Sequence, residues 1–229
     1  MLKNLRPLTA EFVGTFLFVF LGAGSAVVFV ASGPGGQQLA NVGVALTHGL
    51  ALAIVVSATM SISGGHINPA VTTGLWIANK IDGKLALQYI AAQLVGALAG
   101  ATVVKGVMTK LAFEVALGGT PRLAGNVTFM QGVWIEAILT FFLTSAVFGT
   151  VVSRDAPKIG GFGVGLALLA AALVGGTLTG AALNPARAFG PALVAWQWNA
   201  HAVYWIGPLL GAAVAGALWK AVLLPKQGP

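Results

Sequence analysis

The sequence has 229 residues, of which 57% are hydrophobic and 7% charged, and its mean hydropathy is +0.90. So little charge excludes a soluble domain, whose surface needs far more, and makes a membrane protein the expected class. The net charge of +7 comes from twelve basic residues that form no long basic run, so we expect no nucleic acid partner. The absence of cysteine excludes disulfides, thiolate metal sites and cysteine nucleophiles.

Several apolar runs are long enough to cross the hydrocarbon core as helices, which takes about 17–25 residues. In chain order, these runs cover residues 8–31, 39–63, 85–112, 127–152, 159–179 and 201–224. The first run follows Lys3 and Arg6 as in a signal peptide, but it exceeds the usual apolar region of about 7–15 residues. We therefore expect an all-α membrane protein with six transmembrane helices, the first of which is retained.

Two further apolar segments, 68–78 and 184–195, have about half the length of a span, and each begins with Asn-Pro. Asn favours the N-cap and Pro the first helical position, so each segment should open a short helix. Non-helical backbone at membrane depth is tolerated only where protein buries it or a water-filled cavity solvates it, so two half-helices imply such an interior. Two half-helix N-termini meeting there would create a positive electrostatic maximum that repels cations while neutral solutes feel little of it.

The chain contains an internal repeat. Asn68-Pro69-Ala70 recurs as Asn184-Pro185-Ala186 at a matching place in the second half. With three spans in each half, the second half must enter the membrane inverted, so that the half-helices dip from opposite faces. We expect a single channel domain, 1–229, built from inverted repeats at roughly 1–115 and 120–229.

The basic residues predict how the spans are oriented. If the N-terminus is cytoplasmic, the inside segments carry Lys3, Arg6, Lys80, Lys84, Arg154, Lys158, Lys220 and Lys226, and the outside segments carry Lys105, Lys110 and Arg122. This bias favours both termini in the cytoplasm, although the outside link is more basic than the rule prefers. We expect an integral, multi-pass protein in the lipid bilayer of the plasma (inner) membrane.

The segments Ser63-Gly64-Gly65-His66-Ile67-Asn68-Pro69-Ala70-Val71-Thr72 and Asn184-Pro185-Ala186-Arg187 resemble the two signature loops of the aquaporin family, and the resemblance covers essentially the whole chain. It implies a right-handed bundle of six tilted helices plus two half-helices, one pore per protomer and a homotetramer. It also implies that Glu11 and Glu136 brace the signature loops and that His66 lines the inner vestibule.

Glu11 and Glu136 are the acidic residues well inside the expected spans, where an ionisable group suggests a function. A proton relay is one interpretation, but a brace that accepts loop N–H groups better explains one glutamate per half. Arg187 follows Asn184 by three residues, on the same face of the first helical turn, where a cation opposes the helix dipole. This position favours a pore role, and the resemblance places Arg187 at the outer constriction. For His66, spacing alone fits a polar residue flanking a helix equally well.

Counting back from the two asparagines as in the family gives a selectivity filter of His48, Ala172, Ala181 and Arg187, and a one-residue slip would substitute Leu173 for Ala172. The two alanines predict a filter wider than that of strict water channels. A histidine combined with a small loop residue resembles the tonoplast-type and ammonia-permeable aquaporins. A buried histidine that only packs between helices stays an alternative for His48.

The sequence thus predicts a passive channel for water and for small neutral solutes such as ammonia or hydrogen peroxide, with protons and ions excluded. A small polyol or urea facilitator is the alternative, disfavoured because that branch has Asp where this chain has Ala188. An ion-coupled transporter would also use inverted repeats and broken helices, but only two membrane carboxylates are available to it. The three histidines lack ligand spacing, so we expect no enzyme, cofactor or bound metal.

Overall fold

The computed structural model describes residues 5–225, apart from the side chains of 34–38, and this part of the chain contains helices and no strands. Lys3 and Lys226 of the topology prediction lie outside the described residues. Six of the helices are long and apolar enough to span a membrane. These spans are α1 (Leu5–Ala31), α2 (Gly33–Ser63), α4 (Gly83–Val107), α6 (Phe129–Val147, extended by a π-helical turn Phe148–Val152), α7 (Gly161–Thr179) and α9 (Val203–Leu218, extended by a π-helical turn Trp219–Leu223).

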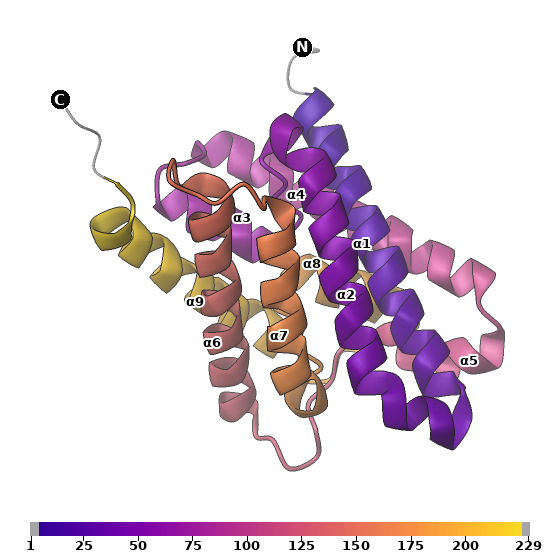
Figure 1. Ribbon diagram of the computed structural model, residues 1–229. Helices are drawn as coiled ribbons and strands as arrows, with labels where there is room; N and C mark the ends of the chain where they lie inside the picture. Colours follow the sequence, from indigo (N-terminus) through magenta and orange to yellow (C-terminus); the bar gives the residue numbers. More distant parts are fainter. Residues whose placement is uncertain (1–4, 226–229) are drawn as a thin grey trace.

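Two half-helices complete the bundle, α3 (Pro69–Ile77) and α8 (Pro185–Ala195). Helix α1 packs against α2 and α4, α6 packs against α7 and α9, and the contact between α2 and α7 joins the two halves. Each half-helix lies on the last span of the other half, α3 on α9 and α8 on α4 (Figure 1). The beginning of α1 and the end of α9 lie at the same end of the bundle.

The spans approach closely where glycine removes the side chain. Gly96 of α4 faces the backbone carbonyl of Phe12 in α1, and Gly211 of α9 faces the carbonyl of Ala137 in α6. A Cβ at either glycine would overlap the facing backbone, so only glycine permits this spacing. The two contacts occupy matching places in the two halves and fix α4 and α9 against the helices that carry the buried glutamates.

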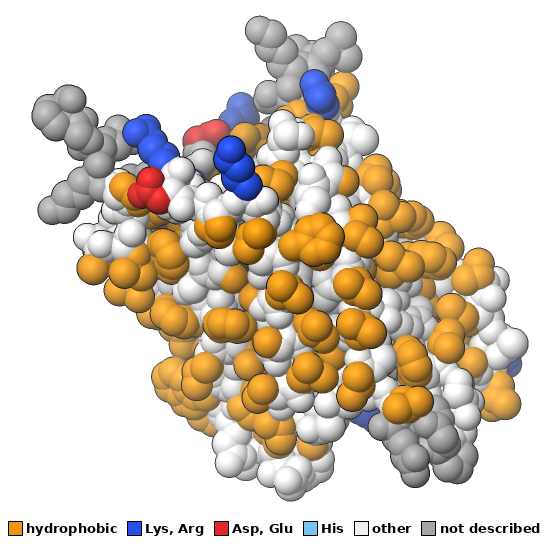
Figure 2. Space-filling model, viewed as in Figure 1, with side chains coloured by type: hydrophobic (Ala, Val, Ile, Leu, Met, Phe, Trp, Pro, Cys, Tyr) orange, Lys and Arg blue, Asp and Glu red, His pale blue; other side chains and the backbone are white. Residues whose placement is uncertain are grey.

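The outer surface of the bundle is apolar along its length. Figure 2 shows orange hydrophobic side chains spread over the sides, while most of the visible lysine, arginine and acidic side chains gather at the end where α1 begins. Ile54 of α2, Ile138 of α6 and Leu166 of α7 are each about 60% exposed, at 62%, 65% and 59%. An apolar surface of this extent is suited to lipid and not to water.

The predicted C-terminal end of the third span, 85–112, is wrong. Helix α4 stops at Val107 because Met108 is extended, with φ −87° and ψ 154°, and the side chain of Thr109 then caps a separate short helix, α5 (Lys110–Val115). The apolar run therefore includes a break that hydropathy does not register. After α5, the 3-10 turn η2 (Leu117–Gly119) leads the chain along a cavity at the end of the bundle opposite the beginning of α1.

Candidate functional site

A buried glutamate in α1 holds the loop that precedes α3. One carboxylate oxygen of Glu11 accepts hydrogen bonds from the Ser63 hydroxyl (2.6 Å) and the backbone N–H of His66 (3.0 Å). The other oxygen accepts from the backbone N–H of Ile67 (2.7 Å) and from the side-chain amide of Gln93 in α4 (2.7 Å). Glu11 is fully buried, so these bonds replace the water that the carboxylate and the loop would otherwise need.

Glu136 of α6 makes the corresponding contacts in the second half. It accepts from the Thr179 hydroxyl (2.6 Å) and the backbone N–H of Ala182 (3.0 Å) through one oxygen, and from the N–H of Leu183 (2.7 Å) through the other. Both glutamates thus bind a hydroxyl and two loop N–H groups at nearly equal distances. Glu136 has no partner like Gln93 among the described residues, which is a difference between the halves.

The half-helices meet end to end through their asparagine caps. The amide oxygen of Asn68 accepts from the N–H of Ala70 (2.8 Å), and Asn184 caps α8 in the same way. The amide nitrogen of Asn68 donates to the carbonyl of Leu183 (2.9 Å), and that of Asn184 donates to the carbonyl of Ile67 (3.0 Å). Each half therefore fixes the asparagine of the other, and these bonds leave one N–H of each amide for the cavity that both side chains line.

The crossed hydrogen bonds depend on two residues in the left-handed region. Ile67 has φ 55° and Leu183 has φ 52°, although neither is glycine. Such a conformation costs about 1–2 kcal/mol for a branched side chain. It allows each residue to donate its N–H to a glutamate and present its carbonyl to the asparagine of the opposite half. The glutamates thus hold the backbone in a shape that its own sequence disfavours.

At the end of the bundle opposite the beginning of α1, which we call the outer end, Arg187 of α8 and His48 of α2 are hydrogen-bonded to each other. Arg187 Nε donates to His48 Nε2 (3.2 Å), and Arg187 Nη1 donates to the carbonyl of Gly119 (3.0 Å). His48 Nδ1 lies 2.8 Å from the carbonyl of Val44, so Nδ1 carries the proton and Nε2 is the acceptor. The guanidinium is therefore fixed from two sides, with N–H groups left over for a solute.

An outer cavity of about 680 Å³ leads down to this pair. Ala172 and Ala181 line it together with His48 and Arg187, so the structure brings the four expected filter residues to one cavity. Leu173 is 42% exposed and is absent from the lining, which favours the register with Ala172. Among its described lining residues, the cavity has two arginines, the other being Arg122, and no carboxylate.

His66 lies on the opposite side of the asparagines and lines the inner cavity. The Thr72 hydroxyl donates to the carbonyl of Asn68 (2.9 Å), so it accepts from both Gln93 (3.0 Å) and His66 Nδ1 (3.1 Å). His66 Nδ1 is therefore protonated, and Nε2 is left as an acceptor. The His66 and Tyr89 rings pack edge to face, with ring centroids 5.1 Å apart.

Sequence reasoning missed several of these groups. They are Gln93, the carbonyl of Gly119 and the left-handed Ile67 and Leu183, and the last three carry no local signal of their role. Gln93 alone could have been found, because an amide in the middle of an apolar span needs a buried partner.

Comparison with known proteins agrees with this geometry. A family model for the major intrinsic proteins matches residues 1–219. The chain belongs to this family. It is 44% identical to aquaporin TIP4-4 of Zea mays, over 97% of this chain and 88% of that protein, and 40% identical to human (Homo sapiens) aquaporin-5, over 97% and 83%. The X-ray structure of the aquaglyceroporin from Plasmodium falciparum superposes with a TM-score of 0.84 at 27% identity, covering 96% of both chains. The expected aquaporin-type fold of a multi-pass membrane protein is thereby confirmed.

Proposed function

We propose that this major intrinsic protein is a passive channel, not an enzyme, that conducts water in single file and excludes protons and ions. The observation that carries the proposal is the meeting of the α3 and α8 N-termini at Asn68 and Asn184 on a narrow cavity. A pair of fixed amide donors at this point can bind the oxygen of a passing water and turn its hydrogens away. The file of hydrogen-bonded water molecules, along which a proton could otherwise pass, would be interrupted there.

Two positive fields support the exclusion of cations. The half-helix dipoles direct their positive ends at the asparagines, and Arg187 adds a buried charge nearer the outside. Arg122, at the rim of the outer cavity, has the same sign. Neutral solutes lose little in this field, whereas a cation meets repulsion from the mouth to the centre.

The glutamates support a channel over an ion-coupled transporter. Each carboxylate oxygen of Glu11 and Glu136 accepts at least one hydrogen bond from the loops or from a neighbouring side chain. A carboxylate that must release and rebind a proton or cation in each cycle would have to break these bonds. Bracing of the loops is therefore the role we propose for both.

For the solutes beyond water, we propose ammonia and hydrogen peroxide. Ala172 and Ala181 present no side chain larger than a methyl group to the outer cavity, and His48 and Arg187 offer polar atoms to a small neutral solute. Several relatives are TIP-type aquaporins, the group whose filter this one was expected to resemble. A polyol or urea facilitator is disfavoured by Ala188.

We further propose a homotetramer built from inverted repeats, with both termini in the cytoplasm. The exposed apolar faces of the spans provide the surface for neighbouring protomers and lipid. The plasma-membrane location expected from the sequence gains no support from the relatives, many of which are of the tonoplast type. Cross-linking in native membranes would test the tetramer, and a dominant monomer band would contradict it.

The channel is tested by stopped-flow measurements on proteoliposomes with water, ammonia, hydrogen peroxide and glycerol. Osmotic water flow should be non-saturating with a low activation energy, whereas a carrier would saturate and depend on an ion. His48→Phe, which narrows the constriction, should lower at least one permeability. The matched control is Leu50→Phe, which adds a ring on the same helix at a side chain that is 48% exposed on the surface of the bundle. Equal fluxes in both variants would contradict the filter assignment, and a proton current through the intact channel would contradict the mechanism.

A further inference from the structure

The fields that repel cations from the pore attract anions. Arg187 and the positive ends of the α3 and α8 dipoles favour a negative charge near the outer end as much as they disfavour a positive one. An anion that arrives at this end first meets the outer cavity, whose volume of about 680 Å³ lies in the range of small-ligand sites. The outer cavity can therefore hold a small organic anion.

The guanidinium of Arg187 is a buried charge without an acidic partner. The residue is 3% exposed. Of the five N–H groups that an arginine carries, one donates to His48 and one to the carbonyl of Gly119. In the part of the chain that the structure describes, the one salt bridge joins Lys110 to Glu114 and does not involve Arg187. A buried cation without a counter-ion favours an anion at its free N–H groups.

The acidic residues of the chain are all placed elsewhere. The sequence has five of them, and none lines the outer cavity. Glu11 and Glu136 bind the loop N–H groups, and Asp82 caps α4. Asp155 lies in the link between α6 and α7, and Glu114, exposed on α5, is paired with a lysine. An anion in the outer cavity therefore meets no carboxylate in the lining.

A second guanidinium belongs to the same lining. Arg122 follows η2 in the chain, and its side chain is exposed at the rim of the cavity. The backbone is held on both sides of it. The carbonyl of Gly119 accepts from Arg187, and the N–H of Ala124 donates to a carbonyl in the last turn of α7 (2.9 Å). Arg122 thus starts from a fixed point, and its planar fork can bind a carboxylate through two parallel hydrogen bonds.

The end of α7 at this cavity is the one group that would oppose an anion, because a helix C-terminus carries partial negative charge. Three of its last carbonyls already accept hydrogen bonds within the protein, namely those of Gly176, Leu178 and Thr179. Their negative ends are therefore turned toward protein donors. The two guanidinium groups remain the dominant charges of the lining.

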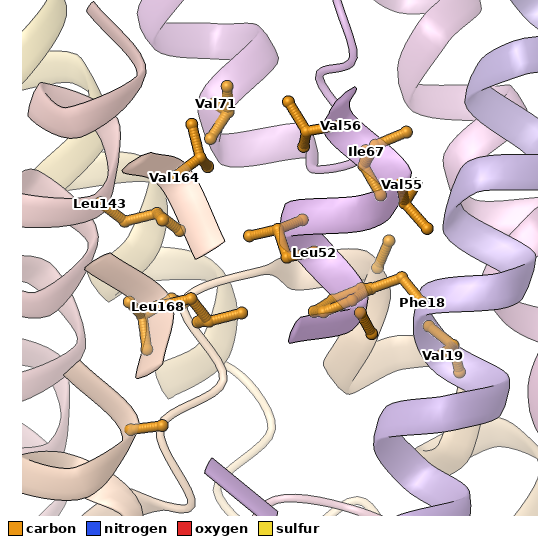
Figure 3. Close-up of a cluster of buried hydrophobic side chains, with 14 of the residues drawn as sticks. Phe18, Val19, Leu52, Val55, Val56, Ile67, Val71, Leu143, Val164 and Leu168 are labelled. Atoms are coloured by element: carbon orange, nitrogen blue, oxygen red, sulfur yellow. The ribbon is translucent and has the colours of Figure 1, made fainter. Parts of the chain in front are cut away.

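An anion that enters the outer cavity does not continue through the pore. The cavity at the asparagines is lined mostly by apolar side chains, among them Leu52, Leu143 and Leu168 (Figure 3). An anion would have to give up its hydration there, and a charge without compensating hydrogen bonds is costly in an apolar surrounding. The anion therefore stays at the outer end, in the path of the water.

We propose that the outer cavity binds a small dicarboxylate anion, which Arg187 and Arg122 hold and which reversibly closes the channel. The proposal rests on the channel function proposed above and names a ligand for its outer cavity. Arg187 binds one carboxylate through its free N–H groups, and Arg122 binds the other at the rim. Loss of Arg122 should therefore weaken binding without removing it.

Binding is tested by isothermal titration calorimetry of the purified full chain in detergent, with malonate and succinate as probes and the neutral malonamide as their control. At least one dicarboxylate should bind, with a millimolar dissociation constant, and malonamide should not. Arg122→Gln should raise the dissociation constant by about twofold to fivefold, the size of one solvent-exposed ion pair. The matched control is Arg154→Gln, which removes an exposed charge at the opposite end of the bundle and should leave the constant unchanged.

Closure is tested by osmotic water flow in proteoliposomes that contain the same dicarboxylate inside and outside, so that channels of both orientations are exposed to it. Each variant is compared with its own flow in the absence of the anion. At a concentration equal to the dissociation constant, half of the channels are occupied, and the flow should fall by about twofold. Sodium chloride at the same ionic strength should inhibit less, because chloride cannot bind both guanidinium groups.

The outcomes separate the site from the channel function. Wild-type vesicles without water flow would remove the function, while calorimetry still reports on the site. The proposal is overturned if no dicarboxylate binds more tightly than malonamide, or if Arg122→Gln and Arg154→Gln bind equally well. It is also overturned if the bound anion leaves water flow unchanged, or if sodium chloride inhibits as strongly as the dicarboxylate.

Discussion

The brace formed by Glu136 can be tested by replacing one oxygen with nitrogen. In Glu136→Gln, the remaining oxygen can keep the bonds from Thr179 and Ala182, but the amide NH₂ then faces the N–H of Leu183, which loses its acceptor at 2.7 Å. An orphaned buried N–H costs about 1–3 kcal/mol, and the two remaining bonds lose their charge assistance. We expect a total loss of about 3 kcal/mol in the free energy of unfolding.

For a chain of this length, about 3 kcal/mol corresponds to a fall in Tm of roughly 6–12 °C. The assay is thermal unfolding of the purified protein in detergent, followed by size-exclusion chromatography, with osmotic water permeability measured in parallel. The control is Glu114→Gln, which removes a charge from an exposed pair with Lys110 at 3.8 Å and should leave Tm nearly unchanged. If Glu136→Gln and Glu114→Gln unfold at the same temperature, the brace contributes no stability and our reasoning is refuted.

Two further variants test the surroundings of the site. In Gly22→Ala, the new Cβ would lie 2.5 Å from His48 Nε2, so the His48 ring must shift and its hydrogen bond with Arg187 should weaken. We expect water permeability to fall severalfold, whereas Gly106→Ala, with nothing within 4 Å of its new Cβ, should change no flux. Equal fluxes in the two variants would show that the position of the His48 ring is unimportant. In Gln93→Leu, Glu11 loses one of its four hydrogen bonds, which should lower the free energy of unfolding by about 1.5–2 kcal/mol. The expected fall in Tm is about 3–8 °C. An unchanged Tm in the same thermal assay would mean that Gln93 does not stabilise the protein.

The sequence by itself determined the membrane class, the number of spans and the two half-helices. These features depend on local properties: apolar runs measured against the thickness of the bilayer, and Asn-Pro as a helix start. Asn68 and Asn184 do cap the half-helices. The end of the third span was wrong because the break at Met108 depends on backbone conformation and not on hydropathy.

The tertiary structure decided how the site is held and which side chains line its cavities. Asn68 bonds to the carbonyl of Leu183, 115 residues away, and Arg187 bonds to that of Gly119, 68 residues away. A backbone carbonyl is the same in every residue, so no residue type marks these partners. The cavity at the asparagines is lined by Phe18, Leu52, Leu143 and Leu168 (Figure 3), which in the sequence resemble any other apolar residue of a span. Only the packing of four helices around the asparagines distinguishes a pore wall from a lipid-facing surface.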